Sequence, residues 1–267
     1  MSIVNDCLII NMDNRPDLWD GLKVFREAFT NVTHTTTNNT TVNNTTVNNT
    51  TTNNTTTNKI HRIPGPDYTT QPHVLNQYIK ENRINLNGSG FRQTKRAFVG
   101  ELGCFQGHYN AWKYIVDNKL ECALVIEDGI TMLRNDYHNI TIDETLDIMF
   151  VNEEMTTAKT EEGIKFVGYG LQGYALTNKG AHKLLKLCYT LNSPIDLQIR
   201  HLCNIDELNA TTIRGPFVKR NHYRVSSIEG IILNDRDNLN AKQSQHSLIQ
   251  RILTGLLEQN VDLGNYV

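Results

Sequence analysis

The sequence lacks the features that mark several other classes of protein. No apolar run approaches the roughly 20 residues that a membrane-spanning helix needs. The N-terminus, MSIVNDCLIINMDNRPD, has neither the basic region nor the small-residue cleavage site of a signal peptide. A net charge of −2 gives no cationic excess for binding nucleic acid or an anionic membrane. We therefore expect a globular cytoplasmic protein with no nucleic-acid partner and no membrane span.

Two further absences concern cofactors and disulfides. No G-x-G-x-x-G motif follows the first apolar run, which argues against a nicotinamide-dependent dehydrogenase. The five cysteines are odd in number, and no pair has the spacing of a metal knuckle. Most of them lie inside apolar runs, so we expect reduced, buried thiols, as is typical of a cytosolic protein.

One segment has an unusual composition. Residues 31–58 are almost wholly Asn and Thr, with NNTT returning at near-regular spacing. Such a segment cannot bury enough apolar area to offset the entropy of ordering, so we expect a disordered surface insertion. Its many Asn-x-Thr sequons are then a by-product of the repeat. Repeats of this kind are typical of AT-rich coding in protists and large DNA viruses; a viral protein would act in the host cytoplasm.

The segments flanking this insertion predict the opening of a parallel βαβ fold. CLIINM (7–12) is an apolar run typical of a strand, and Pro16 is suited to the first turn of a helix. The spacing of Leu18, Leu22, Phe25 and Phe29 gives that helix one apolar face. KIHRIPG (59–65) predicts the next strand and a turn.

The rest of the chain continues in the same α/β style, so we expect a single domain over residues 1–267. The expected elements are a helix over 101–118, strands over 122–126, 147–154, 165–170 and 174–177, a helix capped by Thr177 or Asn178, and a helix start at 194–202. We expect residues 247–259 to form an amphipathic helix that docks or packs on the protein, and such a helix would allow a homodimer.

The strand ALVIEDG (123–129) ends in two carboxylates, Glu127 and Asp128. Ligands of open α/β sheets bind at the carboxyl ends of the strands. Adjacent like charges in a half-buried site need a cation or donor partners, and carboxylates suit Mg²⁺ or Mn²⁺. The alternative is a strand that simply ends in water, with both carboxylates solvated.

Three stretches of the sequence carry a resemblance to a known family. They are IINMDNRPDLWDGLKVF (9–25) followed by HRIPG, VGELGCFQGHYNAW (99–112) and ALVIEDG (123–129), with weaker matches in 174–185 and 194–199. In these stretches the chain resembles the family 25 glycosyltransferases, which include lipooligosaccharide galactosyltransferases and the procollagen galactosyltransferase domain. The second stretch, similar to the family's Gly-Glu-x-Gly-Cys-x-x-Ser-His, is the most specific.

The resemblance implies a GT-A type fold, with a mixed, mostly parallel central sheet flanked by helices. It also implies an inverting transfer of a hexose, galactose or glucose, from a UDP-sugar to a hydroxyl of a saccharide or hydroxylated protein acceptor. The family places an acidic residue in a Pro-x-Asp stretch, so Asp196 is the candidate base that takes the proton of the acceptor hydroxyl. Its alternative role is that of a helix N-terminal carboxylate that binds free amides.

The chain departs from the family pattern at two positions. The family's Ser-His is Gly107-His108 here, and the third acidic position is Gly129. Three outcomes stay open. Asp128, or Glu127 with a distant histidine such as His222, holds Mn²⁺ or Mg²⁺; or Arg92, Lys95 and Arg96 neutralise the diphosphate without metal; or the protein is a catalytically inactive nucleotide-sugar-binding or structural protein.

The remaining candidates are assigned by their place in the predicted fold. The candidate donor-binding residues are Asn11, Arg15, Arg96, Glu101, His108, Glu127 and Asp128. Glu101 either caps its helix or contacts the donor ribose. Glu153 and Glu154 end another strand at the same edge, where one of them would line the acceptor side. Trp19 and Trp112 are expected in the core.

Overall fold

The structure is a computed structural model, which describes residues 1–36, 54–66, 77–78, 81, 83–85, 95–136, 140–168 and 170–221. The helices are α1 (Pro16–Gly21), α2 (Lys23–Thr30), α4 (Lys95–Asp117), α5 (Asn178–Leu187) and α6 (Ile195–Asn204). The strands are β1 (Ser2–Ile3), β2 (Asp6–Met12), β3 (Thr33–Thr36), β4 (Asn54–Thr57), β5 (Lys59–Gly65), β6 (Cys122–Glu127), β7 (Ile130–Met132), β8 (Thr141–Ile142), β9 (Ile148–Phe150), β10 (Met155–Thr160), β11 (Gly163–Gly168), β12 (Gly173–Thr177), β13 (Ala210–Thr212) and β14 (Val218–Arg220).

A six-stranded mixed sheet forms the centre of the molecule, with strand order β13-β9-β12-β6-β2-β5. β2 pairs in parallel with both β5 and β6, and β13 pairs in parallel with β9. β12 runs antiparallel to its two neighbours, β6 and β9. The predicted mixed, mostly parallel α/β sheet is therefore confirmed, and so is the βαβ opening through β2, α1–α2 and β5.

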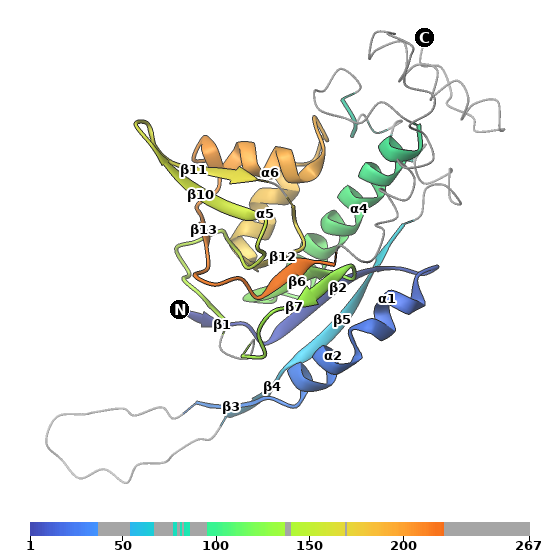
Figure 1. The fold of residues 1–267 in the computed structure, drawn as a ribbon, viewed down its shortest axis with the longest axis vertical. Coiled ribbons are helices and arrows are strands. Elements are labelled where there is room, and N and C mark those ends of the chain that lie inside the picture. Colours follow the sequence, from blue (N-terminus) through green and yellow to red (C-terminus); the bar gives the residue numbers. More distant parts are fainter. Residues whose placement is uncertain are drawn as a thin grey trace, which may run out of the picture.

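Both faces of this sheet are covered, which explains why its central strands read as unbroken apolar runs. In β2, Leu8 and Ile10 pack into the core on one face, while Cys7 and Ile9 pack into the core on the other. Figure 1 shows α4 and α5 on one side of the sheet and α1 and α2 on the opposite side. Alternate side chains of one strand thus enter different cores.

The first predicted helix is interrupted. Leu22 separates α1 from α2, yet all four residues of the predicted apolar face, Leu18, Leu22, Phe25 and Phe29, are buried. Trp112 is fully buried, as expected. Trp19 is only half-buried, and the guanidinium of Arg26 stacks on its ring, 4.1 Å from the centroid.

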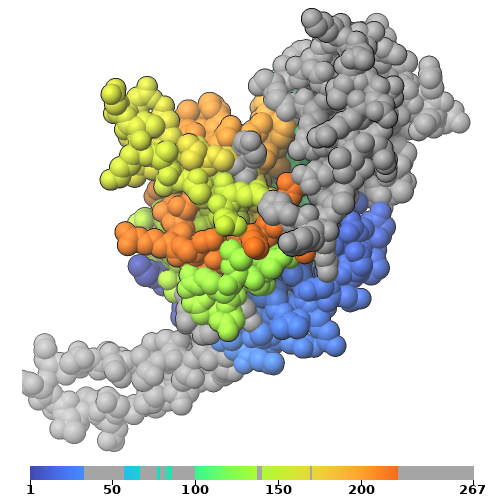
Figure 2. Space-filling view, in the orientation of Figure 1, coloured from blue at the N-terminus to red at the C-terminus, as the bar shows by residue number. Residues whose placement is uncertain are grey.

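One predicted strand lies outside the central sheet. Residues 165–170 were expected to continue that sheet, but β11 pairs only with β10 among the described strands, as an antiparallel hairpin. Figure 2 shows this hairpin projecting from the body of the molecule. Phe166 anchors its inner side, and the Asn204 side chain bonds the backbone N–H and C=O of Phe166, as a neighbouring strand would. Local sequence predicts a strand, but not the partner with which it pairs.

The predicted cap of α5 is Thr177, whose hydroxyl accepts a hydrogen bond from Gly180 N at 3.1 Å. Here α5 approaches β9 so closely that a Cβ at Gly180 would lie 2.2 Å from the carbonyl oxygen of Asp147. Glycine is therefore required at this position by the close contact between helix and strand.

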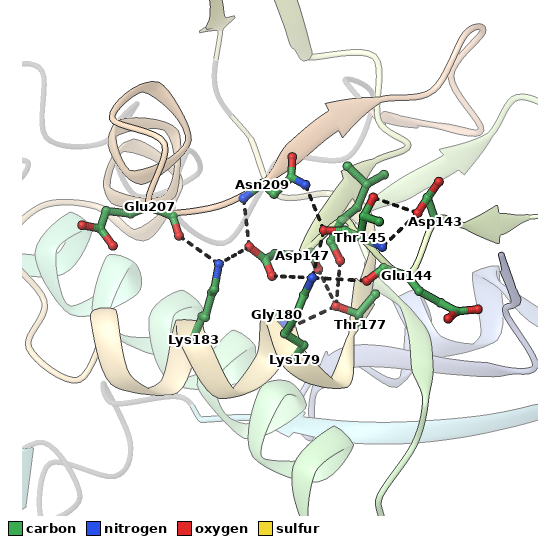
Figure 3. A network of polar contacts seen from close by, with 11 residues as sticks. Asp143, Glu144, Thr145, Asp147, Thr177, Lys179, Gly180, Lys183, Glu207 and Asn209 are labelled. Carbon is green, nitrogen blue, oxygen red and sulfur yellow. Dashed lines mark hydrogen bonds and ion pairs between the residues drawn. The ribbon is translucent and has the colours of Figure 1, made fainter.

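Asp147 is the centre of a polar cluster at the amino-terminal end of β9 (Figure 3). Its side chain is fully buried, and Oδ2 accepts hydrogen bonds from Lys183 Nζ at 2.6 Å and from Asn209 N at 2.9 Å. Lys179 Nζ lies 3.5 Å from the other carboxylate oxygen. These contacts tie α5 and the segment before β13 to the sheet.

The structure describes only the ends of the Asn/Thr-rich insertion and none of the predicted C-terminal helix. The ends of the Asn/Thr-rich segment pair as an antiparallel ladder between β3 and β4, which composition did not predict. Residues 37–53 and the predicted helix over 247–259 lie outside the described residues. Among the described helices, none has the length and apolarity to cross a membrane.

Candidate functional site

The carboxyl ends of β2 and β6 bring together two of the predicted residues, Asn11 and Asp128. Ile10 pairs with Glu127 in the parallel ladder, and Asp128 N donates to Ile10 O at 3.1 Å. Asn11 is buried, and its Nδ2 donates to Asp128 Oδ2 at 2.7 Å and to Arg15 O at 3.0 Å. Asn11 therefore fixes both the acidic turn and the loop that follows β2.

Arg62 extends this arrangement, and sequence reasoning missed it. Arg62 Nε donates to Asn11 Oδ1 at 2.7 Å, and Arg62 Nη1 lies 2.8 Å from Asp13 Oδ1. The result is a continuous polar chain from Asp128 through Asn11 and Arg62 to Asp13. The only signal in the sequence was the HRIPG stretch, where position 62 sits at the end of a predicted strand beside the first one.

His108 anchors Glu127 from the buried side of α4. His108 is 1% exposed; its Nε2 lies 3.2 Å from Glu127 Oε1, and its Nδ1 lies 2.9 Å from the hydroxyl of Tyr174. Trp112 Nε1 donates to the same hydroxyl at 2.8 Å. An indole N–H only donates, so the buried Tyr174 hydroxyl accepts from Trp112 and can direct its own hydrogen to His108 Nδ1. In that tautomer His108 Nε2 carries the ring hydrogen and donates it to Glu127.

Within the described residues, the Glu127 carboxylate makes its side-chain contacts through one of its two oxygens, Oε1. Oε1 faces His108 and, at 3.8 Å, the thiol of Cys104. Within the described part of the chain, no Lys or Arg lies within ion-pair distance of Glu127 or Asp128. The Glu127 side chain is 29% exposed, so a ligand can reach it from solvent.

Burial changes the proton affinity of two carboxyl groups at this edge. Desolvation, with a smaller contribution from Glu127, raises the pKa of Asp128 to about 6, against the opposing hydrogen bond from Asn11. Burial also raises the pKa of Asp196, in the first turn of α6, and the charge of Glu127 adds to this. Glu127 and His108 both act electrostatically on Asp196, so Asp196 lies within electrostatic reach of both.

Both alternatives for Asp196 have a structural basis. Its Oδ1 accepts a hydrogen bond from Leu197 N at 2.9 Å, as expected of a helix N-terminal carboxylate. Its nearness to Glu127 also suits a base at the site. The two roles are compatible, because one oxygen serves the backbone and the other is left for a reacting proton.

The two departures from the family pattern have different structural settings. A Cβ at Gly107 would lie 2.7 Å from Ile10 Cγ2, so glycine allows α4 to pack closely on β2. At Gly129, in the turn between β6 and β7, a Cβ would meet nothing within 4 Å. A side chain is therefore excluded at the first position and sterically permitted at the second.

The remaining predicted site residues differ in where the structure places them. The guanidinium of Arg15 pairs with Asp17, 3.1 Å away, and its charge also acts on Asp128. Glu101 is buried in the second turn of α4, because the helix begins at Lys95; the prediction that Glu101 caps the helix is wrong. Arg92, the side chains of Lys95 and Arg96, and His222 lie outside the described residues.

The two glutamates predicted on the acceptor side, Glu153 and Glu154, have different surroundings. Glu153 is exposed, whereas Glu154 is half-buried and its Oε2 accepts from Gln172 Nε2 at 3.0 Å. Gln172 Oε1 in turn accepts from Asn152 Nδ2 at 3.0 Å, and Gln172 O accepts from Glu127 N at 3.1 Å. This amide–carboxylate cluster therefore adjoins Glu127. Sequence reasoning missed Asn152 and Gln172 because nothing local distinguishes them.

A cavity of 610 Å³ opens beside β5 and α4. Its lining residues are Asp13, Asn14, Pro64, Gly65, Pro66, Gln77, Tyr78, Glu81, Arg83, Gln106, Tyr109, Asn110 and Lys113. The buried guanidinium of Arg83 lies 4.2 Å and 4.1 Å from the ring centroids of Tyr78 and Tyr109, which makes this wall rigid. Gln106 Oε1 is buried without a hydrogen-bond partner among the described residues.

Taken together, these features define an α/β protein whose carboxylates and adjoining cavity lie at the carboxyl edge of a mostly parallel sheet. That is where open α/β sheets bind nucleotides and related ligands. The cavity reaches this edge through Asp13, which ends the polar chain from Asp128.

Comparison with known proteins shows what this part of the chain is similar to. Residues 68–166 match the family described as "Glycosyltransferase family 25 (LPS biosynthesis protein)". Over 104 residues the chain is 31% identical to "Procollagen galactosyltransferase 1" of Danio rerio, a match that covers 33% of this chain and 17% of that protein. "Procollagen galactosyltransferase 2" of Mus musculus is also 31% identical over 104 residues, covering 32% of this chain and 16% of the relative.

These comparisons confirm the resemblance to family 25 and support a glycosyltransferase enzyme. The matched segment includes α4, with Cys104 and His108, and β6, with Glu127 and Asp128. It spans about a sixth of the relatives' length, 17% and 16% of the two proteins.

Proposed function

We propose that the protein is a GT-A type, inverting glycosyltransferase that moves a hexose, galactose or glucose, from a UDP-sugar to a hydroxyl group. The observation that carries this proposal is the pair Glu127 and Asp128 at the carboxyl edge of the sheet, within the segment that matches family 25. Asp196 follows that segment in the chain, and the charge of Glu127 acts on it. A sugar transfer needs a carboxylate to accept the proton of the acceptor hydroxyl, and Asp196 is our candidate.

The cavity beside β5 would hold the nucleoside of the donor. Tyr109, which lines the cavity, offers a ring for stacking with the base. Asp13 lies between this cavity and the acidic turn, so the diphosphate would extend from the cavity toward Asp128. Asn11 would hold Asp128 in place for that contact.

A divalent cation such as Mn²⁺ or Mg²⁺ would supply positive charge to the leaving diphosphate. The carboxylates of Glu127 and Asp128 have the oxygen chemistry that suits these ions. Gly129 contributes no third carboxylate, so the chain's own residues would hold the ion with two acidic side chains instead of three.

The acceptor would be a saccharide or a hydroxylated protein side chain. The relatives' names associate them with procollagen galactosylation, and the family description names LPS biosynthesis. Glu154, Gln172 and Asn152 form a polar surface beside Glu127 that suits acceptor hydroxyls. Hydroxyl groups both donate and accept, which matches a cluster of amides and a carboxylate.

The rival proposal is a catalytically inactive nucleotide-sugar-binding or structural protein. The open space at Gly129 favours it, because the acidic side chain expected there would fit and is missing. Calorimetry with UDP-sugars distinguishes the two proposals, since donor binding without transfer or hydrolysis supports the rival.

The test is UDP release measured across a panel of UDP-sugars, with and without Mn²⁺. We expect turnover with UDP-galactose or UDP-glucose and loss of turnover in Glu127→Gln, with inversion read from the anomeric proton signal of the product. Glu161→Gln, in the exposed turn between β10 and β11, is the control and should behave as wild type. Absence of both turnover and donor binding under all conditions would refute the proposal.

A further inference from the structure

We propose that Cys104, His108 and Glu127 form a Zn²⁺ site, and that Zn²⁺ bound there competes with the sugar donor for Glu127. The competition rests on the proposed function, whereas the binding of Zn²⁺ does not. The site is distinct from an oxygen-only site for Mn²⁺, because two of its three ligands are a thiol and an imidazole.

The geometry fits tetrahedral zinc. The three potential ligand atoms all lie within 4.8 Å of one another. Glu127 Oε1 lies 3.2 Å from His108 Nε2 and 3.8 Å from Cys104 Sγ. Usual Zn–N, Zn–O and Zn–S bond lengths place tetrahedral ligands about 3.4 Å (N to O) and about 3.6 Å (S to O) apart. Small side-chain shifts would therefore suffice.

The fold holds this set together through two elements. Cys104 and His108 are four residues apart on α4, so they share one face of the helix, and Glu127 ends the strand β6 beneath it. Gly107, between them, lets the helix approach Ile10 closely. Three protein ligands leave the fourth zinc position open, and Glu127 gives access from solvent.

The surrounding hydrogen bonds would rearrange in a defined way. Metal-bound histidine usually donates its second ring N–H to a neighbouring oxygen, and the Tyr174 hydroxyl lies 2.9 Å from His108 Nδ1. The imidazole would change tautomer without net loss of a proton. Burial raises the pKa of Cys104 well above its ordinary value, with the Glu127, Asp196 and Glu101 charges adding to this, so the free site holds a thiol. Zinc uptake would release that thiol proton to solvent.

Ligand chemistry selects the ion. Thiolate and imidazole favour Zn²⁺, whereas Mg²⁺ and Mn²⁺ favour carboxylate and water. Once zinc is bound at Glu127 Oε1, its positive charge offsets the carboxylate charge that would otherwise attract Mn²⁺ and the donor. Zn²⁺ should therefore inhibit where Mn²⁺ activates.

Co²⁺ is the probe for direct binding, because four-coordinate Co²⁺ with a thiolate ligand gives a thiolate-to-metal charge-transfer band and strong visible bands. We expect the chelator-treated full chain to bind Co²⁺ with these bands, and Zn²⁺ to displace it. Cys104→Ser should abolish the charge-transfer band. Glu127→Gln should weaken Zn²⁺ binding, and Tyr174→Phe should weaken it about tenfold through the lost partner of His108.

Cys122→Ser is the matched control, since Cys122 is a buried thiol at the opposite end of β6 and should leave the spectrum unchanged. Absence of the charge-transfer band in the wild type, or its retention in Cys104→Ser, would overturn the site. Zn²⁺ binding that leaves the calorimetric affinity for UDP-sugar unchanged would overturn the competition. A protein that binds no UDP-sugar would fail the proposed function while leaving the cobalt result intact.

Discussion

Both ends of the central sheet carry buried or half-buried acidic side chains, but the two sets of side chains have different partners. At the amino-terminal end of β9, Asp147 is fully buried and faces two lysines and a backbone N–H (Figure 3). At the carboxyl end of β6, Glu127 and Asp128 have only Asn11, His108 and Cys104 as side-chain hydrogen-bond partners within the described residues. One end has its charge compensated, and the other does not.

This difference indicates the role of each end. A buried charge that is paired within the fold serves the architecture, because its removal leaves the partner cations without a counter-charge. Carboxylates that have no lysine or arginine in contact keep an excess of negative charge. Burying that charge is unfavourable, and the pKa of Asp128 is raised as a result. Such an excess is typical of a site that awaits a cation or a proton.

The largest expected effect concerns Asp196→Asn. Asparagine still accepts the hydrogen bond from Leu197 N but no longer accepts a proton, so transfer should fall about 10²- to 10⁴-fold. The measurement is kcat for UDP release, with the thermal midpoint of unfolding as a check on folding. Asp206→Asn, at an exposed position just beyond the end of the same helix, is the control. Unchanged kcat would leave Asp196 as a helix carboxylate alone.

The second effect falls at the opposite end of the sheet. Asp147→Asn leaves Lys179 and Lys183 without their counter-charge, and both lysines are half-exposed and able to turn to water. We expect a loss of about 2 kcal/mol in the free energy of unfolding. Urea denaturation measures it, with Glu161→Gln as the exposed control. Donor affinity of the folded variant should stay the same, and a change there would break the proposed division between the two ends.

The third effect is a gain at the acidic turn. Gly129→Asp adds a carboxylate where a Cβ meets nothing within 4 Å, so it should leave stability unchanged and tighten Mn²⁺ binding about tenfold. A Mn²⁺ titration of donor binding or turnover measures this. Gly129→Asn has the same size without the charge and should not tighten binding. An equal response of the two variants would show that charge at this position is irrelevant.

The smallest effect is a pH dependence of stability. The folded pKa of Asp128, about 6, exceeds its ordinary value of 3.8, so the folded state binds more protons between these values. Its contribution to stability is present below about pH 4 and is lost as the pH rises through about 6. Asp128→Asn should remove this slope and make the protein about 1 kcal/mol more stable at pH 7.

Urea unfolding between pH 4 and 7 in chelator-containing buffer tests this expectation. The variant should also lose affinity for the donor or for Mn²⁺, because the buried charge of Asp128 destabilises the fold but serves the site. If the free energy of unfolding varies with pH in the same way for wild type and Asp128→Asn, the folded state does not raise the pKa of Asp128.

Local pattern predicted much of the architecture. The apolar runs of β2 and β6, the Pro16 helix start, the Thr177 cap and the buried face of α1–α2 were all predictable, because they depend on neighbours in sequence. The start of α4, the break at Leu22 and the separate β10–β11 hairpin were not.

The site divides in the same way. Glu127 and Asp128 stood out in the sequence because charge directly follows an apolar strand. Arg62, Tyr174, Gln172 and Cys104 gave no such signal, since their importance arises from contacts across 51, 66, 18 and 23 residues of chain.

The sequence by itself determined that this is an α/β protein with an acidic strand end that resembles family 25, because periodicity and short motifs are local properties. Only the tertiary structure decided which oxygen of Glu127 is held, that Gly107 is required and Gly129 is not, and that Cys104 meets His108 and Glu127. These are distances between elements, and they are set by how the two cores pack against the sheet.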